Sequence, residues 1–297
     1  MKPFLKWAGG KQQILTDVLQ LFPREIEDYY EPFIGGGSVL LGLLSSDIKI
    51  RGKVYASDIN VNLISVYQNI QQNPEEVIEE LQKIIKEYDS CRDRNIVNRK
   101  PKNIEEAITS QESYYYWIRQ QYNNIKTPSV LSSAMFIFLN KTCFRGLYRE
   151  GPNGFNVPYG NYKNPGIMDN DHIMDISRLI KDVTFTVVSF EEILKKPKIG
   201  DFIYLDPPYA PETNTSFVGY TSEGFNIQKH MQLFTGCHEL NAKRVKFLMS
   251  NADVCMVRDN MNLYHIHVII CKRAINSKKP GSKTNELLII NDINEAT

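Results

Sequence analysis

Hydrophobic residues gather in short runs towards both ends of the 297-residue chain and in longer helical patterns in its middle. Short apolar runs bounded by glycine, proline or acidic residues are typical of buried strands. Such runs occur at residues 29–34, 54–57, 183–188, 202–205 and 245–250, and a closing antiparallel pair is indicated at 263–271 and 286–291. Because helical patterns alternate with them, at about 11–22, 39–44 and 226–241, the sequence predicts an α/β fold with a largely parallel sheet.

The middle of the chain has a different pattern. No strand interrupts four helical patterns, at residues 62–72, 74–88, 111–124 and 130–139. In the second of them, Val77, Leu81 and Ile84 fall on one face, as expected for a helix packed against a core. We therefore expect a helical domain, residues 62–166, inserted between the segments 1–61 and 167–297, which together form the α/β domain.

Composition and charge exclude several classes of protein. Hydrophobic residues make up 42% and the net charge is +1, so a nucleic-acid partner would need a local basic patch. The five cysteines form no C-x-x-C pair, which argues against a disulfide framework or a metal site and favours a reducing compartment. No apolar run is long enough to span a membrane and the N-terminus has no apolar leader, so we expect a cytoplasmic protein.

Glycine-containing segments in the first 60 residues point to a small-molecule site. Gly9-Gly10-Lys11 lacks the other residues of a phosphate-binding loop, which disfavours a nucleoside triphosphatase. Gly35-Gly36-Gly37 joins a predicted strand to a helix, and Asp58 ends the next strand 23 residues after Gly35. That spacing is typical of a carboxylate that binds nucleoside ribose hydroxyls. Glu31, just before the turn, would suit a cofactor with cationic character.

The segment Asp206-Pro207-Pro208-Tyr209 ends the apolar run 202–205. Ligands of open α/β sheets bind at the carboxyl ends of the strands. The prolines fix the backbone and remove competing N–H groups. Asp206 and the Pro207 carbonyl could therefore accept both hydrogens of a planar amine, while Tyr209 stacks on its ring. A strand followed by a tight turn is the alternative interpretation of the same residues.

Two further segments combine features of nucleic-acid binding. The glycine-rich loop at 140–160 carries Arg145 and Arg149, which suit guanine edges and phosphates, and Phe144, which could wedge into a base stack. Residues 272–283, including Lys278 and Lys279, contain five basic residues and no acid, and could grip phosphates. Ordinary solvated loops are the alternative for both segments.

Taken together, these motifs resemble the Dam-type DNA adenine-N6 methyltransferases over nearly the whole chain. They are F-L-K-W-A-G-G-K at 4–11, E-P-F-I-G-G-G-S at 31–38, D-I-N at 58–60, N-V-P-Y-G at 156–160, D-P-P-Y at 206–209, S-N at 250–251 and N-E-L-L at 285–288. The resemblance implies a Rossmann-like S-adenosylmethionine-dependent methyltransferase sheet, in a catalytic domain of residues 1–61 and 167–297. It implies that residues 62–166 are an inserted helical target-recognition domain with a hairpin loop. The implied reaction moves a methyl group from S-adenosyl-L-methionine to adenine N6 in double-stranded DNA, at GATC and by base flipping.

The resemblance also assigns individual residues. Those implied at the cofactor are Trp7, Lys11, Phe33, Gly35, Gly37, Asp58, Phe190 and Asp206, and those implied in catalysis are Asp206, Pro207 and Tyr209. Those implied at DNA are Lys6, Phe144, Arg145, Leu147, Arg149, Pro158, Lys278 and Lys279, with Phe144 as the wedge. Two positions depart from some relatives: Ser189 stands where they carry Asp, and Arg145 where they carry Asn.

The implied chemistry needs no metal and no covalent enzyme intermediate, because the methyl donor is already activated and positioning can supply most of the rate. Two other classes stay open: a methyltransferase for cytosine N4, RNA or a small molecule, and a DNA-binding protein without activity. Asp rather than Ser at position 206 argues against the first, and the intact motifs argue against the second. A cognate restriction endonuclease, a bacterial, phage or viral source, and a monomer or weak dimer all remain open at this point.

Overall fold

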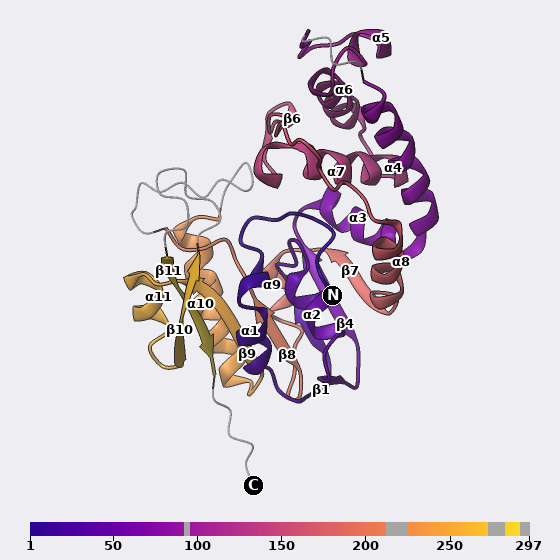
Figure 1. Ribbon diagram of the computed structural model, residues 1–297. Coiled ribbons are helices and arrows are strands. Elements are labelled where there is room, and N and C mark those ends of the chain that lie inside the picture. The colour runs from indigo at the N-terminus through magenta and orange to yellow at the C-terminus, as the bar shows by residue number, and fades with distance from the viewer. Residues whose placement is uncertain (92–95, 212–224, 273–282, 292–297) are drawn as a thin grey trace. The chain divides into compact units, whose positions relative to one another are not determined.

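The computed structural model describes residues 1–91, 96–211, 225–272 and 283–291, which fall into two compact units (Figure 1). The first unit contains residues 1–2, 10–59 and 182–297, and the second contains 3–9 and 60–181. The second unit therefore runs to Lys181 and includes a segment near the N-terminus, beyond the limits expected for the insertion. Lys278 and Lys279 lie outside the described residues.

A seven-stranded sheet in the order β10-β11-β9-β8-β2-β4-β7 forms the centre of the first unit. The strands are β2 (Tyr29–Glu31), β4 (Val54–Asp58), β7 (Val183–Val187), β8 (Phe202–Leu205), β9 (Lys246–Ala252), β10 (His265–Lys272) and β11 (Lys283–Ile290). The five from β7 to β9 pair in parallel, and β11 runs antiparallel to both of its neighbours. The predicted α/β fold with a closing antiparallel pair is confirmed. A separate two-stranded sheet joins β1 (Glu25–Ile26) and β3 (Lys49–Ile50).

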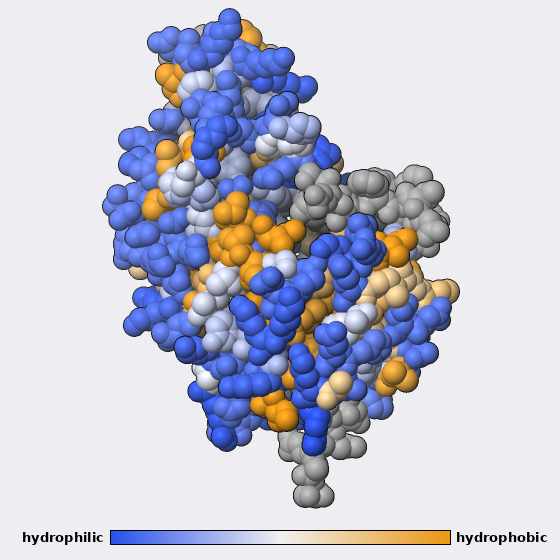
Figure 2. Space-filling view, turned by 180° about the vertical axis from the view of Figure 1, so that it is seen from behind, coloured by the Kyte–Doolittle hydropathy of each residue, from blue (hydrophilic) through white to orange (hydrophobic). Residues whose placement is uncertain are grey.

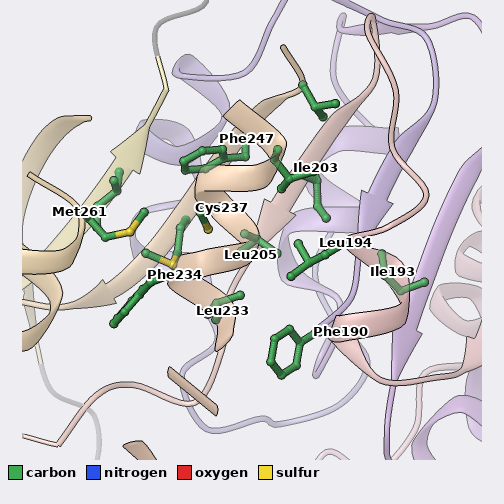
Figure 3. Close-up of a cluster of buried hydrophobic side chains, with 14 of the residues drawn as sticks. Phe190, Ile193, Leu194, Ile203, Leu205, Leu233, Phe234, Cys237, Phe247 and Met261 are labelled. Atoms are coloured by element: carbon green, nitrogen blue, oxygen red, sulfur yellow. The ribbon is translucent and has the colours of Figure 1, made fainter. Parts of the chain in front are cut away.

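Helices cover both faces of this sheet. They are η1 (Lys11–Gln13), α1 (Leu15–Gln20), α2 (Ser38–Leu44), α9 (Phe190–Ile193), α10 (Ile227–Ala242) and α11 (Cys255–Asn260). In β8, Ile203 belongs to a buried cluster with Phe234 of α10 (Figure 3). The next residue back, Phe202, points to the opposite face and meets Phe22, at a ring-centroid distance of 4.5 Å. This double burial explains why β8 is apolar throughout rather than alternating.

The second unit is mainly helical. Its elements are α3 (Val61–Gln72), α4 (Pro74–Asp89), α5 (Ile104–Ala107), α6 (Gln111–Asn124), α7 (Val130–Thr142), η2 (Phe144–Gly146), β5 (Glu150–Gly151), β6 (Gly154–Phe155) and α8 (Asn170–Leu179). Helix α7 is buried along most of its length and packs against α3, α4 and α6. Side chains of Asn60, Ser110 and Ser129 cap α3, α6 and α7 by accepting from backbone N–H groups. The four predicted helices are present, whereas α5 and α8 were not predicted.

No helix in the described part of the chain is long and apolar enough to cross a membrane. The face of the molecule in Figure 2 is mostly hydrophilic, with hydrophobic side chains in small groups.

Candidate active site and nucleic-acid interface

The glycine turn and Asp58 lie side by side at one edge of the first unit's sheet. Gly35 and Gly37 have φ angles of 46° and 71°, a region that favours glycine. The Gly35 N–H donates to Asp58 Oδ2 over 3.3 Å, and Ile34 N–H donates to the Ser57 carbonyl over 3.0 Å. The turn after β2 is thus held against the end of β4, where the sequence predicted a carboxylate.

Glu31, the last residue of β2, is almost completely buried, with 2% of its surface exposed. Its Oε2 accepts a 2.7 Å hydrogen bond from the Tyr29 hydroxyl. Burial raises the pKa of Glu31 to about 8; the Tyr29 hydrogen bond opposes this rise and the charge of Asp206 adds to it. A pKa of about 8 favours the protonated form of Glu31 at neutral pH.

Asp206 follows β8 directly and makes the shortest ion pair of this region. Its Oδ1 lies 2.7 Å from Lys11 Nζ, which also lies 3.6 Å from Oε1 of Glu286 in β11. The Tyr209 hydroxyl donates to the same Glu286 oxygen, and the ammonium of Lys11 sits 4.9 Å from the centre of the Tyr209 ring. Four side chains from distant parts of the sequence thus form one connected cluster, which we call the acid–lysine cluster.

The acid–lysine cluster has strongly perturbed ionisation. Burial raises the pKa of Asp206 to about 6; the nearby Lys11 ammonium opposes the rise and the Glu286 charge adds to it. Burial alone would lower the pKa of Lys11, but the charges of Asp206 and Glu286 outweigh it and raise that pKa. Such perturbed groups at the carboxyl end of a parallel strand are typical of functional sites.

The backbone after Tyr209 is held by the end of β9. The Ala210 N–H donates to Asn251 Oδ1 over 3.0 Å, and the Tyr204 and Ser250 hydroxyls are hydrogen-bonded at 2.7 Å. Ser250 and Asn251 are fully buried. The S-N motif therefore holds the chain on both sides of the D-P-P-Y segment. The position of the motif in the sequence did not predict this role.

Aromatic rings gather beside the glycine turn. Phe33 stacks on Phe190 at 5.4 Å between ring centroids, and Phe225 packs against both. Phe190 is buried, and Lys229 lies with its ammonium 5.8 Å from the Phe190 ring. The structure thus brings Phe33 and Phe190 together, as expected if both contact one planar ligand.

In the second unit, Asn140 joins the segment 3–9 to the loop after α7. Its Oδ1 accepts from the Lys6 N–H at 2.8 Å, and its Nδ2 donates to the Lys6 and Gly146 carbonyls at 2.7 and 3.3 Å. Gly146 has a φ of 63°, and a Cβ there would lie 2.4 Å from the Lys6 Cβ, so this close approach requires glycine. Lys6, whose side chain is exposed, is thereby placed beside the loop that carries Phe144.

The exposed residues predicted to contact DNA lie on one loop region of this unit. The Phe144 N–H donates to the Pro158 carbonyl at 2.8 Å, and the Phe144 ring is 45% exposed. Arg145 adopts a left-handed φ of 59° and stacks on Phe144 with its guanidinium carbon 5.1 Å from the ring centre. Arg149 is braced by Asn156 across the β5–β6 hairpin, through a 2.6 Å bond from Nε to Asn156 Oδ1. Leu147 follows η2 and is partly buried.

Trp7 belongs to the second unit rather than to the cluster around Asp206. Its ring stacks on Tyr148 at 5.6 Å and on Phe136 at 6.4 Å between centroids. The other residues predicted at the cofactor lie in the first unit.

Comparison with known proteins gives a consistent picture. Residues 7–275 match the model of the D12 class N6 adenine-specific DNA methyltransferases. Type II methyltransferase M.MjaIII of Methanocaldococcus jannaschii is 36% identical, over 98% of this chain and 99% of its own. Type II methyltransferase M1.LlaDCHI of Lactococcus lactis subsp. cremoris is 32% identical, over 98% and 95%. The DNA adenine methylase of Escherichia coli K12 is 27% identical, over 97% and 95%.

Proposed function

Because this chain belongs to the D12 class of N6 adenine-specific DNA methyltransferases, we propose that it methylates adenine N6 at a specific site in double-stranded DNA through Asp206. Membership of this methyltransferase family implies S-adenosylmethionine as the methyl donor. The observation that carries the proposal is the acid–lysine cluster at the end of β8, where a partly exposed carboxylate, two prolines and a tyrosine stand together. The first unit would be the catalytic domain expected at 1–61 and 167–297, and the second unit the target-recognition domain expected at 62–166, with the bounds of the two units, which place residues 3–9 and 167–181 in the second.

The residues that the first unit brings together can bind the chemical groups of S-adenosylmethionine. Asp58 beside Gly35 would bind the ribose hydroxyls, and Gly35 and Gly37 would let the backbone approach closely. The stacked pair of Phe33 and Phe190 would flank the adenine of the cofactor. Two carboxylates sharing the single ammonium of Lys11 leave an excess of negative charge, which suits a cationic ligand. Lys11 completes the proposed cofactor residues of this unit, and Trp7, which lies in the second unit, stays a prediction.

When bound, the cofactor supplies a methyl group already activated by its sulfonium. The protein then has to present a poor nucleophile, since the lone pair of the adenine amine is delocalised into the ring. Asp206 and the Pro207 carbonyl would accept the two N6 hydrogens and favour a nitrogen whose lone pair points outward. Tyr209 would stack on the base. Positioning and electrostatics of this kind can supply most of the rate.

The target adenine must leave the base stack to reach such a site, which costs a few kcal/mol. Phe144, exposed on the loop of the second unit, would fill the gap in the duplex, and Arg145 would support it through the stacking described above. We propose GATC as the target, with Arg149 reading a guanine, Leu147 and Pro158 contacting thymine, and Lys6 among the residues that contact its bases. The hairpin contact to Asn156 supports the role of Arg149, because it fixes the side chain before DNA arrives.

Lys278 and Lys279 remain predictions as phosphate contacts.

Two of the relatives are named Type II methyltransferases, which supports a restriction-modification setting with a cognate endonuclease. Cell extract from the source organism would then cut unmethylated plasmid at the site that this protein protects.

The central test is Asp206→Ala, assayed with labelled cofactor on double-stranded DNA. We expect loss of methyl transfer with the fold retained, because Asp206 follows a strand in a partly exposed position. Asp259→Ala, the same change at an exposed position of α11, serves as the control. Near-normal turnover by folded Asp206→Ala would rule out the mechanism. Digestion of plasmid from expressing cells with GATC-specific, methylation-sensitive nucleases tests the target sequence separately.

A further inference from the structure

We propose that Glu286 is a positioning residue for methyl transfer, which competes with Asp206 for the Lys11 ammonium and so keeps Asp206 a stronger hydrogen-bond acceptor for the target adenine than an undivided ion pair with Lys11 would leave it. This inference rests on the proposed role of Asp206. It gives a function to a glutamate of β11 that touches neither the D-P-P-Y backbone nor the glycine turn in any contact described above.

The geometry shows one ammonium between two acids. Lys11 Nζ lies 2.7 Å from Asp206 Oδ1 and 3.6 Å from Glu286 Oε1. Coulomb attraction falls with the inverse of distance, so the pull of Glu286 is about three quarters of that of Asp206. A movement of about one ångström by the flexible lysine side chain would reverse the preference. Lys11 is 3% exposed, so water competes little for its charge.

The consequence for Asp206 follows from the properties of hydrogen bonds. An ammonium in direct contact neutralises a carboxylate and weakens it as an acceptor for a neutral N–H donor. If Glu286 lost its charge, Asp206 would be the one charged acid of this pair left to attract Lys11. The adenine amine would then meet a less basic carboxylate, and the hydrogen bonds that expose the nitrogen lone pair would weaken.

Glu286 has a second connection that a test must separate from the first. Its Oε1 accepts the hydroxyl of Tyr209, whose ring is proposed to stack on the base. Glu286→Gln keeps an oxygen acceptor for this hydroxyl and removes only the charge. Tyr209→Phe keeps the charge and the ring and removes only the hydroxyl. The two variants therefore separate the charge of Glu286 from its contact with the Tyr209 hydroxyl, and the oxygen of Gln can still accept the hydrogen bond that links Cys271 to Glu286.

Other ionisable groups also face the acid–lysine cluster, and none of them is substituted in these variants. They come from β2, β8 and β10, and are Tyr29, Glu31, Tyr204 and Cys271. Glu31 is neutral at pH 7 in the parent, as argued above, so it does not replace the charge of Glu286.

The experiment compares the parent, Glu286→Gln, Tyr209→Phe, Lys11→Met and the double variant Lys11→Met/Glu286→Gln. Single-turnover methylation rates are measured from pH 5 to 9 at saturating cofactor and DNA. For Glu286→Gln we expect a rate at pH 7 lowered about tenfold or more, with the acid limb of the profile moved about one unit to lower pH. Lys11→Met should move that limb to higher pH. The double variant should be no slower than Lys11→Met alone. Once the Lys11 ammonium is gone, the charge of Glu286 has no shared cation through which to affect Asp206.

A readout that needs no turnover is the ¹³C NMR titration of the Asp206 carboxyl carbon, assigned with Asp206→Asn. Its midpoint should fall in Glu286→Gln and stay in place in Tyr209→Phe. Additive losses in the double variant, or an acid limb moved equally by Tyr209→Phe, would overturn the inference and leave Glu286 as an anchor for the tyrosine ring. An active Asp206→Ala protein would instead remove the proposed function itself, so the two failures are distinguishable.

Discussion

Replacing Glu31 by Gln should make the stability of the first unit less dependent on pH. Glu31 is 2% exposed and accepts a hydrogen bond from Tyr29 at 2.7 Å, and burial raises its pKa to about 8. Gln has the same shape, can accept the Tyr29 hydroxyl, and cannot ionise. The change therefore removes the ionisation while leaving the packing in place.

The sign and size follow from linkage between ionisation and folding. The folded-state pKa of Glu31 is raised, so its contribution to stability is complete below the unfolded value of 4.5 and is lost as the pH rises through about 8. Each pH unit in that window costs the parent about 1.4 kcal/mol. By pH 7 the loss is about 3 kcal/mol, and above pH 9 it is about 5 kcal/mol.

Urea unfolding of the parent and of Glu31→Gln, followed by circular dichroism from pH 5 to 8, measures this difference. Both tryptophans, Trp7 and Trp117, lie in the second unit, so tryptophan fluorescence monitors that unit in the same samples. Glu239→Gln, the same change at an exposed position of α10, is the control. The advantage of Glu31→Gln over the parent should grow steadily with pH, whereas Glu239→Gln should track the parent. A constant difference across this range would refute the conclusion that Glu31 is buried as the neutral acid.

Three further predictions concern the proposed function. Asp58→Ala should weaken cofactor binding by about 1–3 kcal/mol, and unchanged affinity by calorimetry would place the ribose elsewhere. The parent's methylation rate should fall as the pH drops through about 6, because burial raises the pKa of Asp206 to about 6 and the protonated acid no longer accepts both hydrogens; a rate that is flat from pH 5 to 7 would contradict this. Arg149→Ala should narrow the rate gap between GATC and duplexes altered at one guanine, since a bidentate contact is worth about 1–3 kcal/mol. Equal slowing on every duplex would instead make Arg149 a phosphate contact.

Much of the fold was predictable because its central strands are buried on both faces. A strand such as β8, with helices on either side, must be apolar at every position, and this leaves a visible run in the sequence. Helix α8 was not predicted; it has ten residues, and Ile173, Ile176 and Ser177 are the ones buried on it. The helix expected at 11–22 is divided at Ile14 into η1 and α1, and the local sequence holds no proline or glycine there to mark the division.

The site shows a similar division between what was predictable and what was not. The glycine turn, Asp58 and Asp206 end the neighbouring strands β2, β4 and β8. Parallel strands present their carboxyl ends at one edge, so motifs at strand ends can be expected to meet even when they are far apart in sequence. Glu286 gave no such signal, because it lies inside an antiparallel strand opposite Ala252. Only the pairing of β11 with β9 brings it beside the segment held by Asn251.

The same physical reasoning explains why the chain can tolerate so many acids in one buried region. Three carboxylates without partners would each cost several kcal/mol in a poorly solvated site. Here Glu31 avoids the cost by staying protonated, while Asp206 and Glu286 share Lys11. A cationic cofactor would relieve the remaining excess of negative charge, so binding and ionisation should be coupled at the acid–lysine cluster. The arrangement is therefore costly for the empty protein and favourable for the loaded one, as expected where acids are retained for function rather than for stability.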